Sequence, residues 1–158
     1  MTDTTLIATH RKALRDYHVL ESIEAGIALV GTEIKSIRNR RVNLEDSFAR
    51  IDEGEAFLYN MHVSPYEPGG RFNVEPTRVR KLLLHGQQIE RLQGLLSRRG
   101  VALIPLRVYL KHGLAKVELA ICKGKKLYEK REQMRQHEIE RELRRTFKHY
   151  RRKGRREQ

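Results

Sequence analysis

The side chains best suited to chemistry are seven histidines, one cysteine and a few adjacent acids, and their spacing matches no familiar active site. No two histidines have metal-site spacing, and Cys122 has no second cysteine with which to form a zinc site or a disulfide. Gly124-Lys125 lacks the glycine five positions earlier that a phosphate-binding loop requires. The serines lack the small-residue elbow of a hydrolase nucleophile. We therefore expect no metal, no cofactor and no enzymatic activity.

Adjacent acids leave one catalytic alternative open. Glu45-Asp46 and Asp52-Glu53 could hold a metal for a nuclease if their carboxylates converged. Both pairs also fit a solvated turn or the end of a strand or helix. Metal-dependent RNA cleavage that is abolished by alanine at Glu45, Asp46 or Asp52 would establish this alternative.

Positive charge is the strongest compositional signal and it is unevenly distributed. The net charge is +13, and residues 123–158 contain 15 Lys+Arg and 6 Asp+Glu, which gives that segment a net charge of +9. Two smaller basic clusters lie at 38–41 and 78–81. Such an excess favours a polyanionic partner, and RNA is the partner we expect.

One acid and two aromatic residues have two interpretations each. A carboxylate such as Glu24 is unfavourable beside RNA unless it accepts hydrogen bonds from base amino groups. The local sequence alone favours an exposed turn carboxylate at Glu24. Tyr17 and Phe72 could stack on unpaired bases, or could belong to the core.

Hydrophobic periodicity predicts a mainly β body over 1–122. Strands are expected at 17–23 and 27–30 around a turn at Gly26, with hairpins at 47–51/56–62 and 101–110/114–121. Helices are expected after a Thr32 cap and at 87–98, whereas 1–9 has no strong pattern and is expected to be loose. This order favours a small closed OB-like β-barrel with flanking α-helices.

The last segment, 123–158, has a different character and is expected to be a separate basic tail. At ~100° per residue, Ile139, Leu143, Phe147 and Tyr150 fall within an arc of ~80°. So thin an apolar stripe favours a tail that is disordered alone and helical when bound. No apolar run is long enough for a membrane span and no secretory signal is evident, so we expect a cytoplasmic protein.

Short motifs also occur along nearly the whole chain in a specific order. They are RKA at 11–13, DY at 16–17, EAG at 24–26, GTEIKS at 31–36, NL at 43–44, DSF at 46–48, GEAFL at 54–58, HVSPY at 62–66, RKLLL at 80–84, GKKLY at 124–128 and KR at 130–131. Together they resemble the SsrA-binding protein (SmpB) family.

That resemblance implies an RNA-binding adaptor of trans-translation. Such proteins bind the tRNA-like domain of tmRNA and deliver it to the empty A site of a stalled ribosome. The tail would enter the vacant mRNA channel near the decoding centre of the small ribosomal subunit and sense the missing message. Elongation factor Tu would be engaged indirectly, through the charged tmRNA, and neither a membrane nor a small-molecule substrate is implied.

The resemblance also assigns roles to residues. The family's RNA-contacting glutamate falls on Glu24, its leucine on Leu83, and a neighbouring polar position, asparagine in some relatives, on His85. The expected tmRNA site comprises Tyr17, Glu24, Arg80, Lys81, Leu83 and His85. The expected ribosome contacts are Lys123, Gly124, Lys125, Lys126, Glu129, Lys130, Arg131, Ile139, Leu143 and Phe147, with Glu129-Lys130-Arg131 in place of an Asp-Lys-Arg pattern. A general single-stranded RNA-binding protein is the alternative.

Overall fold

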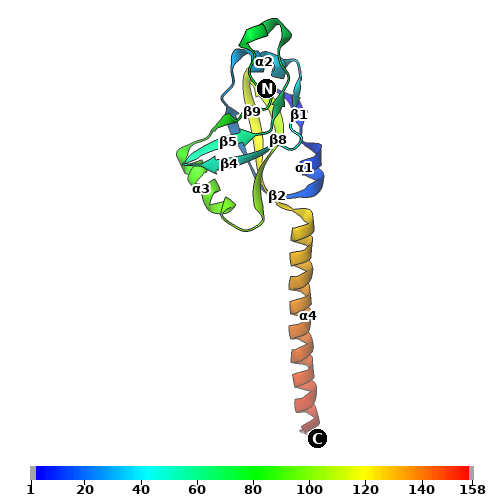
Figure 1. The fold of residues 1–158 in the computed structure, drawn as a ribbon. Helices are drawn as coiled ribbons and strands as arrows, with labels where there is room; N and C mark the ends of the chain where they lie inside the picture. Colours follow the sequence, from blue (N-terminus) through cyan, green and yellow to red (C-terminus); the bar gives the residue numbers. More distant parts are fainter. Residues whose placement is uncertain (1–2, 157–158) are drawn as a thin grey trace. The chain divides into compact units, whose positions relative to one another are not determined.

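A computed structural model describes residues 3–156, including all of their side chains except those of 126–130 and 155–156. Short helices alternate with strands in the body, and a long helix ends the chain (Figure 1). The elements are β1 (Thr4–Thr9), α1 (Arg11–Asp16), β2 (Tyr17–Ile27), α2 (Gly31–Arg38), β3 (Val42–Asn43), β4 (Phe48–Asp52), β5 (Glu55–Tyr59), β6 (His62–Val63), the 3₁₀ segment η1 (Glu67–Phe72), β7 (Arg80–Leu83), α3 (Gly86–Leu96), β8 (Val101–Lys111), β9 (Leu114–Gly124) and α4 (Lys125–Arg156).

Seven strands form one antiparallel sheet in the order β1-β8-β4-β5-β7-β2-β9. β9, at one end of this order, also pairs with β8 near the other end, from Val101↔Lys123 to Lys111↔Leu114. β3 and β6 form a separate two-stranded sheet. A mainly β fold with flanking helices and two hairpins, β4–β5 and β8–β9, is thereby confirmed.

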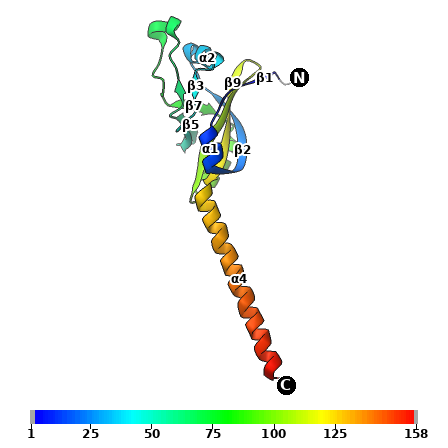
Figure 2. The ribbon, with the colours of Figure 1, turned by 90° about the vertical axis from the view of Figure 1, so that its right-hand side faces the viewer.

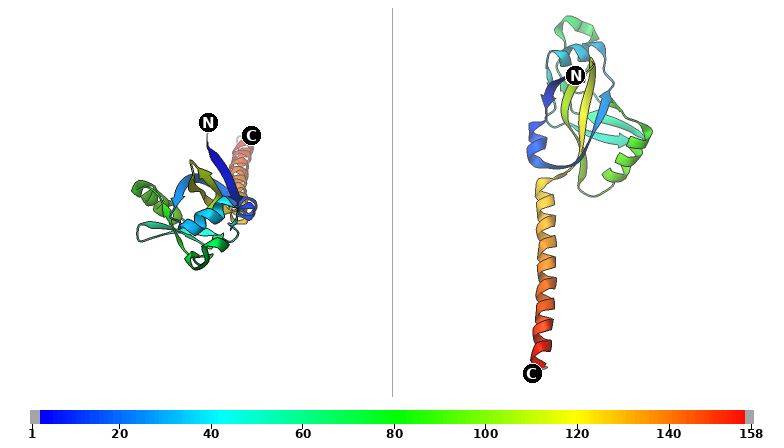
Figure 3. Two further views of the ribbon diagram at one scale, coloured as in Figure 1. Left: turned by 90° about the horizontal axis from the view of Figure 1, so that it is seen from above. Right: turned by 180° about the vertical axis from the view of Figure 1, so that it is seen from behind.

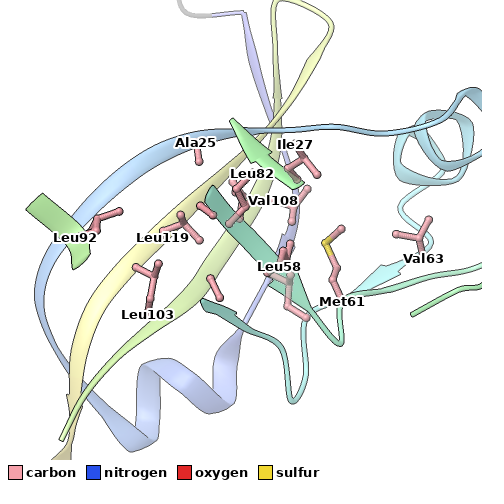
Figure 4. Packing of buried hydrophobic residues seen from close by; sticks show 14 of the residues in the cluster. Ala25, Ile27, Leu58, Met61, Val63, Leu82, Leu92, Leu103, Val108 and Leu119 are labelled. Carbon is pink, nitrogen blue, oxygen red and sulfur yellow. The ribbon is translucent and has the colours of Figure 1, made fainter. Parts of the chain in front are cut away.

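The core follows from strand alternation. Val117, Leu119 and Ile121 are buried at every second position of β9, since alternate side chains point to one face of a sheet. Leu58 and Leu82 bring β5 and β7 into the same cluster (Figure 4). Each fully buried aliphatic side chain contributes about 1.5–3 kcal/mol relative to leaving it in water. The apolar interior therefore fixes which faces of β2, β8 and β9 point outward.

A smaller apolar cluster lies under α1, which covers the outer side of the sheet beside β2 (Figure 2). Ala13 of α1 packs there with Ile104, Leu106 and Ala120. Cys122 completes this cluster, and burial raises the pKa of its thiol to about 11. Cys122 is consequently a packing residue and not a reactive thiolate.

Three local expectations were wrong. Residues 4–9 form β1, because the edge of β8 supplies hydrogen-bond partners from Thr4↔Lys111 to Thr9↔Arg107. β2 continues through Gly26 without a turn, since Gly26 pairs with strands on both sides. Thr32 lies inside α2 and does not cap it; instead the Glu33 carboxylate accepts a hydrogen bond from the Val30 N–H at 3.1 Å.

Internal contacts divide the chain into two compact units, Met1–Gly124 and Lys125–Gln158. Within the first unit, α2 and η1 lie together at one end of the sheet, as both views in Figure 3 show. The second unit is the single helix α4. No helix in the described part of the chain is long and apolar enough to span a membrane.

Candidate nucleic-acid interface

A surface depression of about 810 Å³ lies where β2, β7 and the start of α3 meet. Four of the six residues expected to bind tmRNA line it: Glu24, Lys81, Leu83 and His85. They converge because β2 and β7 pair at Gly26↔Leu83 and α3 begins just after β7. The structure thus brings into one place residues that are about 60 positions apart in the sequence.

The glycine at position 26 gives Leu83 room in this arrangement. A Cβ atom on Gly26 would lie 3.2 Å from the Cβ of Leu83, closer than nearly all real contacts of this kind. Leu83 occupies that space, and it is 54% exposed at the last position of β7. An exposed apolar side chain therefore lines a depression that Glu24, Lys81 and His85 also line.

Glu24 is fixed by two residues of β8. The Tyr109 hydroxyl donates a hydrogen bond to Oε2 of Glu24, and the Lys111 Nζ lies 3.5 Å from the same oxygen. The Tyr109 hydrogen bond, with help from the charge of Lys111, lowers the pKa of Glu24 below its ordinary value although partial burial opposes this. Glu24 is therefore an oriented carboxylate, and within the described residues its contacts leave Oε1 available as an acceptor.

Tyr109 and Lys111 were not predicted from the sequence. Both lie at alternate positions of β8 beyond the irregularity between Pro105 and Arg107, where outward-pointing residues begin to be polar. That alternation was the only signal in the sequence. It did not indicate that Glu24, on β2, would lie beside these two residues of β8.

His85 and Lys81 also line the depression. His85 precedes the first turn of α3, and its backbone N–H donates a hydrogen bond to Oε1 of Gln88 at 3.0 Å. The Lys81 Nζ lies 3.3 Å from Oε1 of Glu55, and both side chains are about half exposed. An exposed ion pair of this kind contributes little to stability, so the Lys81 ammonium can exchange Glu55 for a phosphate.

Arg80 was expected to contact RNA, and the structure contradicts this. Its side chain is completely buried, with Nε 2.6 Å from Oε2 of Glu33 and Nη1 2.6 Å from the Met61 carbonyl oxygen. The reason is strand alternation, since Arg80 points inward with Leu82 whereas Lys81 and Leu83 point outward. Its guanidinium cannot reach an RNA phosphate from there.

Glu33 is the partner of Arg80, and its structural role was not predicted from the sequence. Burial by itself would raise the pKa of Glu33, but hydrogen bonds from Arg78 and the Val30 N–H, together with the charge of Arg80, lower it below its ordinary value. Two guanidiniums thus hold one buried carboxylate and join α2 to β7 and to the segment just before it.

Tyr17 does not line the depression. It is half-buried, packs with the α1 cluster, and pairs with Gly124 at the end of β9. Glu45, Asp46 and Asp52, considered for a nuclease, belong to the turns and strand around β4. Among residues 3–156, apart from those with undescribed side chains, no group of three His, Cys, Asp or Glu side chains is placed to hold a metal.

The expected tail residues divide between two elements. Lys123 and Gly124 end β9, whereas Lys125 and Arg131 belong to α4 and are exposed. The side chains of Lys126, Glu129 and Lys130 lie outside the described residues. Along α4 the four apolar residues of the stripe are all exposed: Ile139, Leu143, Phe147 and Tyr150.

Comparisons with known proteins agree with these motifs. The family model described as SmpB protein matches residues 7–149. The SsrA-binding proteins of Caldicellulosiruptor bescii and Enterococcus faecalis are 57% and 56% identical to this chain, over 94% and 93% of it and 94% and 96% of their own lengths. A solved chain described as "tmRNA-SmpB: a journey to the center of the bacterial ribosome" is 46% identical, with a TM-score of 0.66 over 77% of this chain and 85% of that one. This chain therefore belongs to the SmpB protein family.

Proposed function

We propose that this protein is a non-enzymatic RNA-binding adaptor of trans-translation that binds the tRNA-like domain of tmRNA and delivers it to the empty A site of stalled ribosomes. The observation that carries the proposal is the depression at which Glu24, Lys81, Leu83 and His85 meet, in a chain that belongs to the SmpB family. Elongation factor Tu would be engaged only through the charged tmRNA, and the protein would act in the cytoplasm.

The chemistry of the depression suits selective RNA recognition. The free oxygen of Glu24 can accept a hydrogen bond from an exocyclic amino group, as acidic side chains do from cytosine. Lys81 and Lys116 border the same depression and can contact the adjacent phosphates. Leu83 offers an apolar surface to a base or a ribose. A carboxylate rejects RNA that presents no donor to it, so Glu24 would supply selectivity and the lysines affinity.

The body would act as a closed OB-like barrel. Pairing runs from β8 through β4, β5, β7, β2 and β9 and returns to β8, with β1 attached outside this ring. Such closure leaves no edge open within the ring and supports a rigid depression. In this proposal residues 1–122 form the RNA-binding part and 123–158 form the tail.

The tail would probe the vacant mRNA channel. Its net charge of +9 suits a channel lined by ribosomal RNA, where each phosphate contact releases counterions. The exposed stripe at Ile139, Leu143, Phe147 and Tyr150 would be buried only when the channel is empty. An mRNA in the channel would exclude the helix, so that the tail could enter only a ribosome whose message has ended.

The test compares the full-length protein binding to the tRNA-like domain of tmRNA, a random duplex and a random single strand at one salt concentration. Glu24→Ala should weaken binding to the tRNA-like domain alone, by roughly 5- to 150-fold for a lost base contact of ~1–3 kcal/mol. Glu90→Ala is the matched control because it removes the same charge from an exposed position of α3. Equal weakening of all three RNAs, or of none, would favour the general single-strand binder instead.

A further inference from the structure

The most exposed aromatic ring in the body belongs to η1, which lies with α2 at one end of the sheet. Phe72 is 68% exposed, and none of the residues of η1 lines the Glu24 depression. Leaving a phenylalanine in water forgoes the stabilisation that burial would bring. Its position therefore calls for an explanation other than folding stability.

The loop that carries Phe72 has a defined backbone. Asn73 Oδ1 accepts a hydrogen bond from the Tyr66 N–H at 2.8 Å, and Asn73 Nδ2 donates to the carbonyl oxygens of Tyr66 and Gly70 at 2.7 and 3.1 Å. The Thr32 hydroxyl donates to the Phe72 carbonyl at 3.4 Å and joins the loop to α2. The ring is thus presented by a loop that has already lost much of its conformational freedom, which reduces the entropy cost of binding.

One cation lies over the Phe72 ring and another over the neighbouring Tyr66 ring. The Arg71 guanidinium lies 5.1 Å from the centre of the Phe72 ring, and the Lys35 Nζ lies 5.3 Å from the centre of the Tyr66 ring. Arg38 ends α2, and it is exposed together with Arg40 and Arg41, which follow it. The Arg40 Nη1 donates a hydrogen bond to the Leu6 carbonyl oxygen at 2.7 Å. Within the described side chains none of these five cations forms an ion pair with an acid, and the one exposed acid in 31–41 and 66–73 is Glu67.

A single exposed ring among cations that form no ion pair within the described side chains differs from a protein-docking surface. Protein interfaces have a core that is depleted in charged residues and contains several apolar neighbours. In 31–41 and 66–73, Phe72 is the one large apolar side chain that is exposed. Aromatic rings flanked by Arg and Lys are instead the pattern by which proteins stack on unpaired bases and contact the adjoining phosphates.

We propose that Phe72, Arg71 and the cations of α2 form a second RNA-binding surface, which stacks an unpaired base on the Phe72 ring. This surface, termed the Phe72 platform, goes beyond the proposed function because it uses none of the residues that line the Glu24 depression. An adaptor with two such surfaces can contact two RNA segments at once, and each contact raises the effective concentration of the other.

The test uses the full chain carrying Glu24→Ala, so that binding reports on the remaining surfaces. The probes are a single strand of about 12 nucleotides containing 2-aminopurine and the fully paired duplex of the same sequence. Phe72→Ala should weaken single-strand binding by roughly 5-fold or more and abolish the quenching of 2-aminopurine, while duplex binding changes less than about 2-fold. Arg71→Ala should reduce the salt dependence of binding to both RNAs by about one counterion.

Leu114→Ala is the matched control, because Leu114 is 62% exposed and starts β9 at a hairpin. Identical affinities and quenching for the Phe72→Ala and Leu114→Ala proteins would overturn the Phe72 platform. Wild-type behaviour of Phe72→Leu would overturn base stacking, since leucine keeps the apolar surface but has no ring. The two substitutions are also made singly in the otherwise unchanged chain. If Glu24→Ala then weakens binding to the tRNA-like domain selectively and Phe72→Ala has no effect, the proposed function stands and only the Phe72 platform is refuted.

Discussion

Tyr109→Phe tests whether Glu24 acts as an oriented carboxylate. The substitution removes one hydroxyl from a half-buried ring and leaves Glu24 with Lys111 as its partner. Hydrogen bonds to charged groups contribute about 1.5–3 kcal/mol, but the Glu24 side chain is 39% exposed and water can replace part of this. We therefore expect a loss of about 1 kcal/mol, or about 5-fold in affinity for the tRNA-like domain.

The pH dependence gives this prediction a second readout. The hydroxyl lowers the pKa of Glu24, so its removal should raise that pKa. RNA binding through the ionised carboxylate is present above the pKa and is lost as the pH falls through it. The Tyr109→Phe protein should accordingly lose selective binding at a higher pH than the wild type when the pH is lowered.

Fluorescence anisotropy with the labelled tRNA-like domain, measured from neutral pH downward at fixed salt, provides the assay. Tyr59→Phe serves as the control, because it removes a hydroxyl from a ring that stacks on Phe48 outside the depression. Wild-type affinity and an unshifted pH profile for Tyr109→Phe, together with weak binding by Glu24→Ala, would refute the orienting role of Tyr109.

Three further changes test the rest of the molecule. Glu33→Gln should destabilise the body by about 3–5 kcal/mol in thermal unfolding, since it leaves a buried guanidinium uncompensated, whereas Glu90→Gln should have little effect. Because the folded-state pKa of Glu33 is depressed, its contribution should be present above the ordinary value of 4.5 and decline as the pH falls through the folded-state pKa. Truncation after Gly124 keeps β9 whole and should preserve tmRNA binding while abolishing tagging on stalled ribosomes. Leu143→Asp should reduce tagging roughly 10-fold without affecting RNA binding, and His137→Asp, which introduces the same side chain outside the apolar stripe, should not.

Sequence periodicity predicted the elements whose patterns are local. The hairpins β4–β5 and β8–β9 each combine alternating apolar residues with a turn sequence, and both are present. β1 could not be predicted in this way, because a short edge strand depends on hydrogen bonds from a partner about 100 residues later. Gly26 was misread for a similar reason, since the glycine permits a close approach of Leu83 and does not form a turn.

In the candidate site too, local motifs predicted some residues, whereas others depend on contacts with distant parts of the chain. Glu24 and Leu83 were assigned from motifs, and strand pairing places them at one depression. Arg80 was assigned to RNA because it belongs to a basic cluster, although the burial of Leu82 two positions later indicates that Arg80 also points inward. Local charge patterns cannot reveal an acid such as Glu33, 47 positions away, that makes the burial of an arginine possible.

The body places its charged groups in two distinct ways, and the difference bears on how selectivity arises. Glu24 and Glu33 are both held by defined donors from other elements, so each carboxylate has a fixed direction. The cations of α2, Lys35 and Arg38, are exposed and form no ion pair within the described side chains, so they can follow any phosphate backbone. A flexible cation attracts every RNA to a similar degree, whereas a fixed carboxylate is compatible only with RNA that presents a donor at that point. Loss of a cation should therefore weaken all RNAs together and alter the salt dependence, and loss of the fixed acid should erase the difference between RNAs.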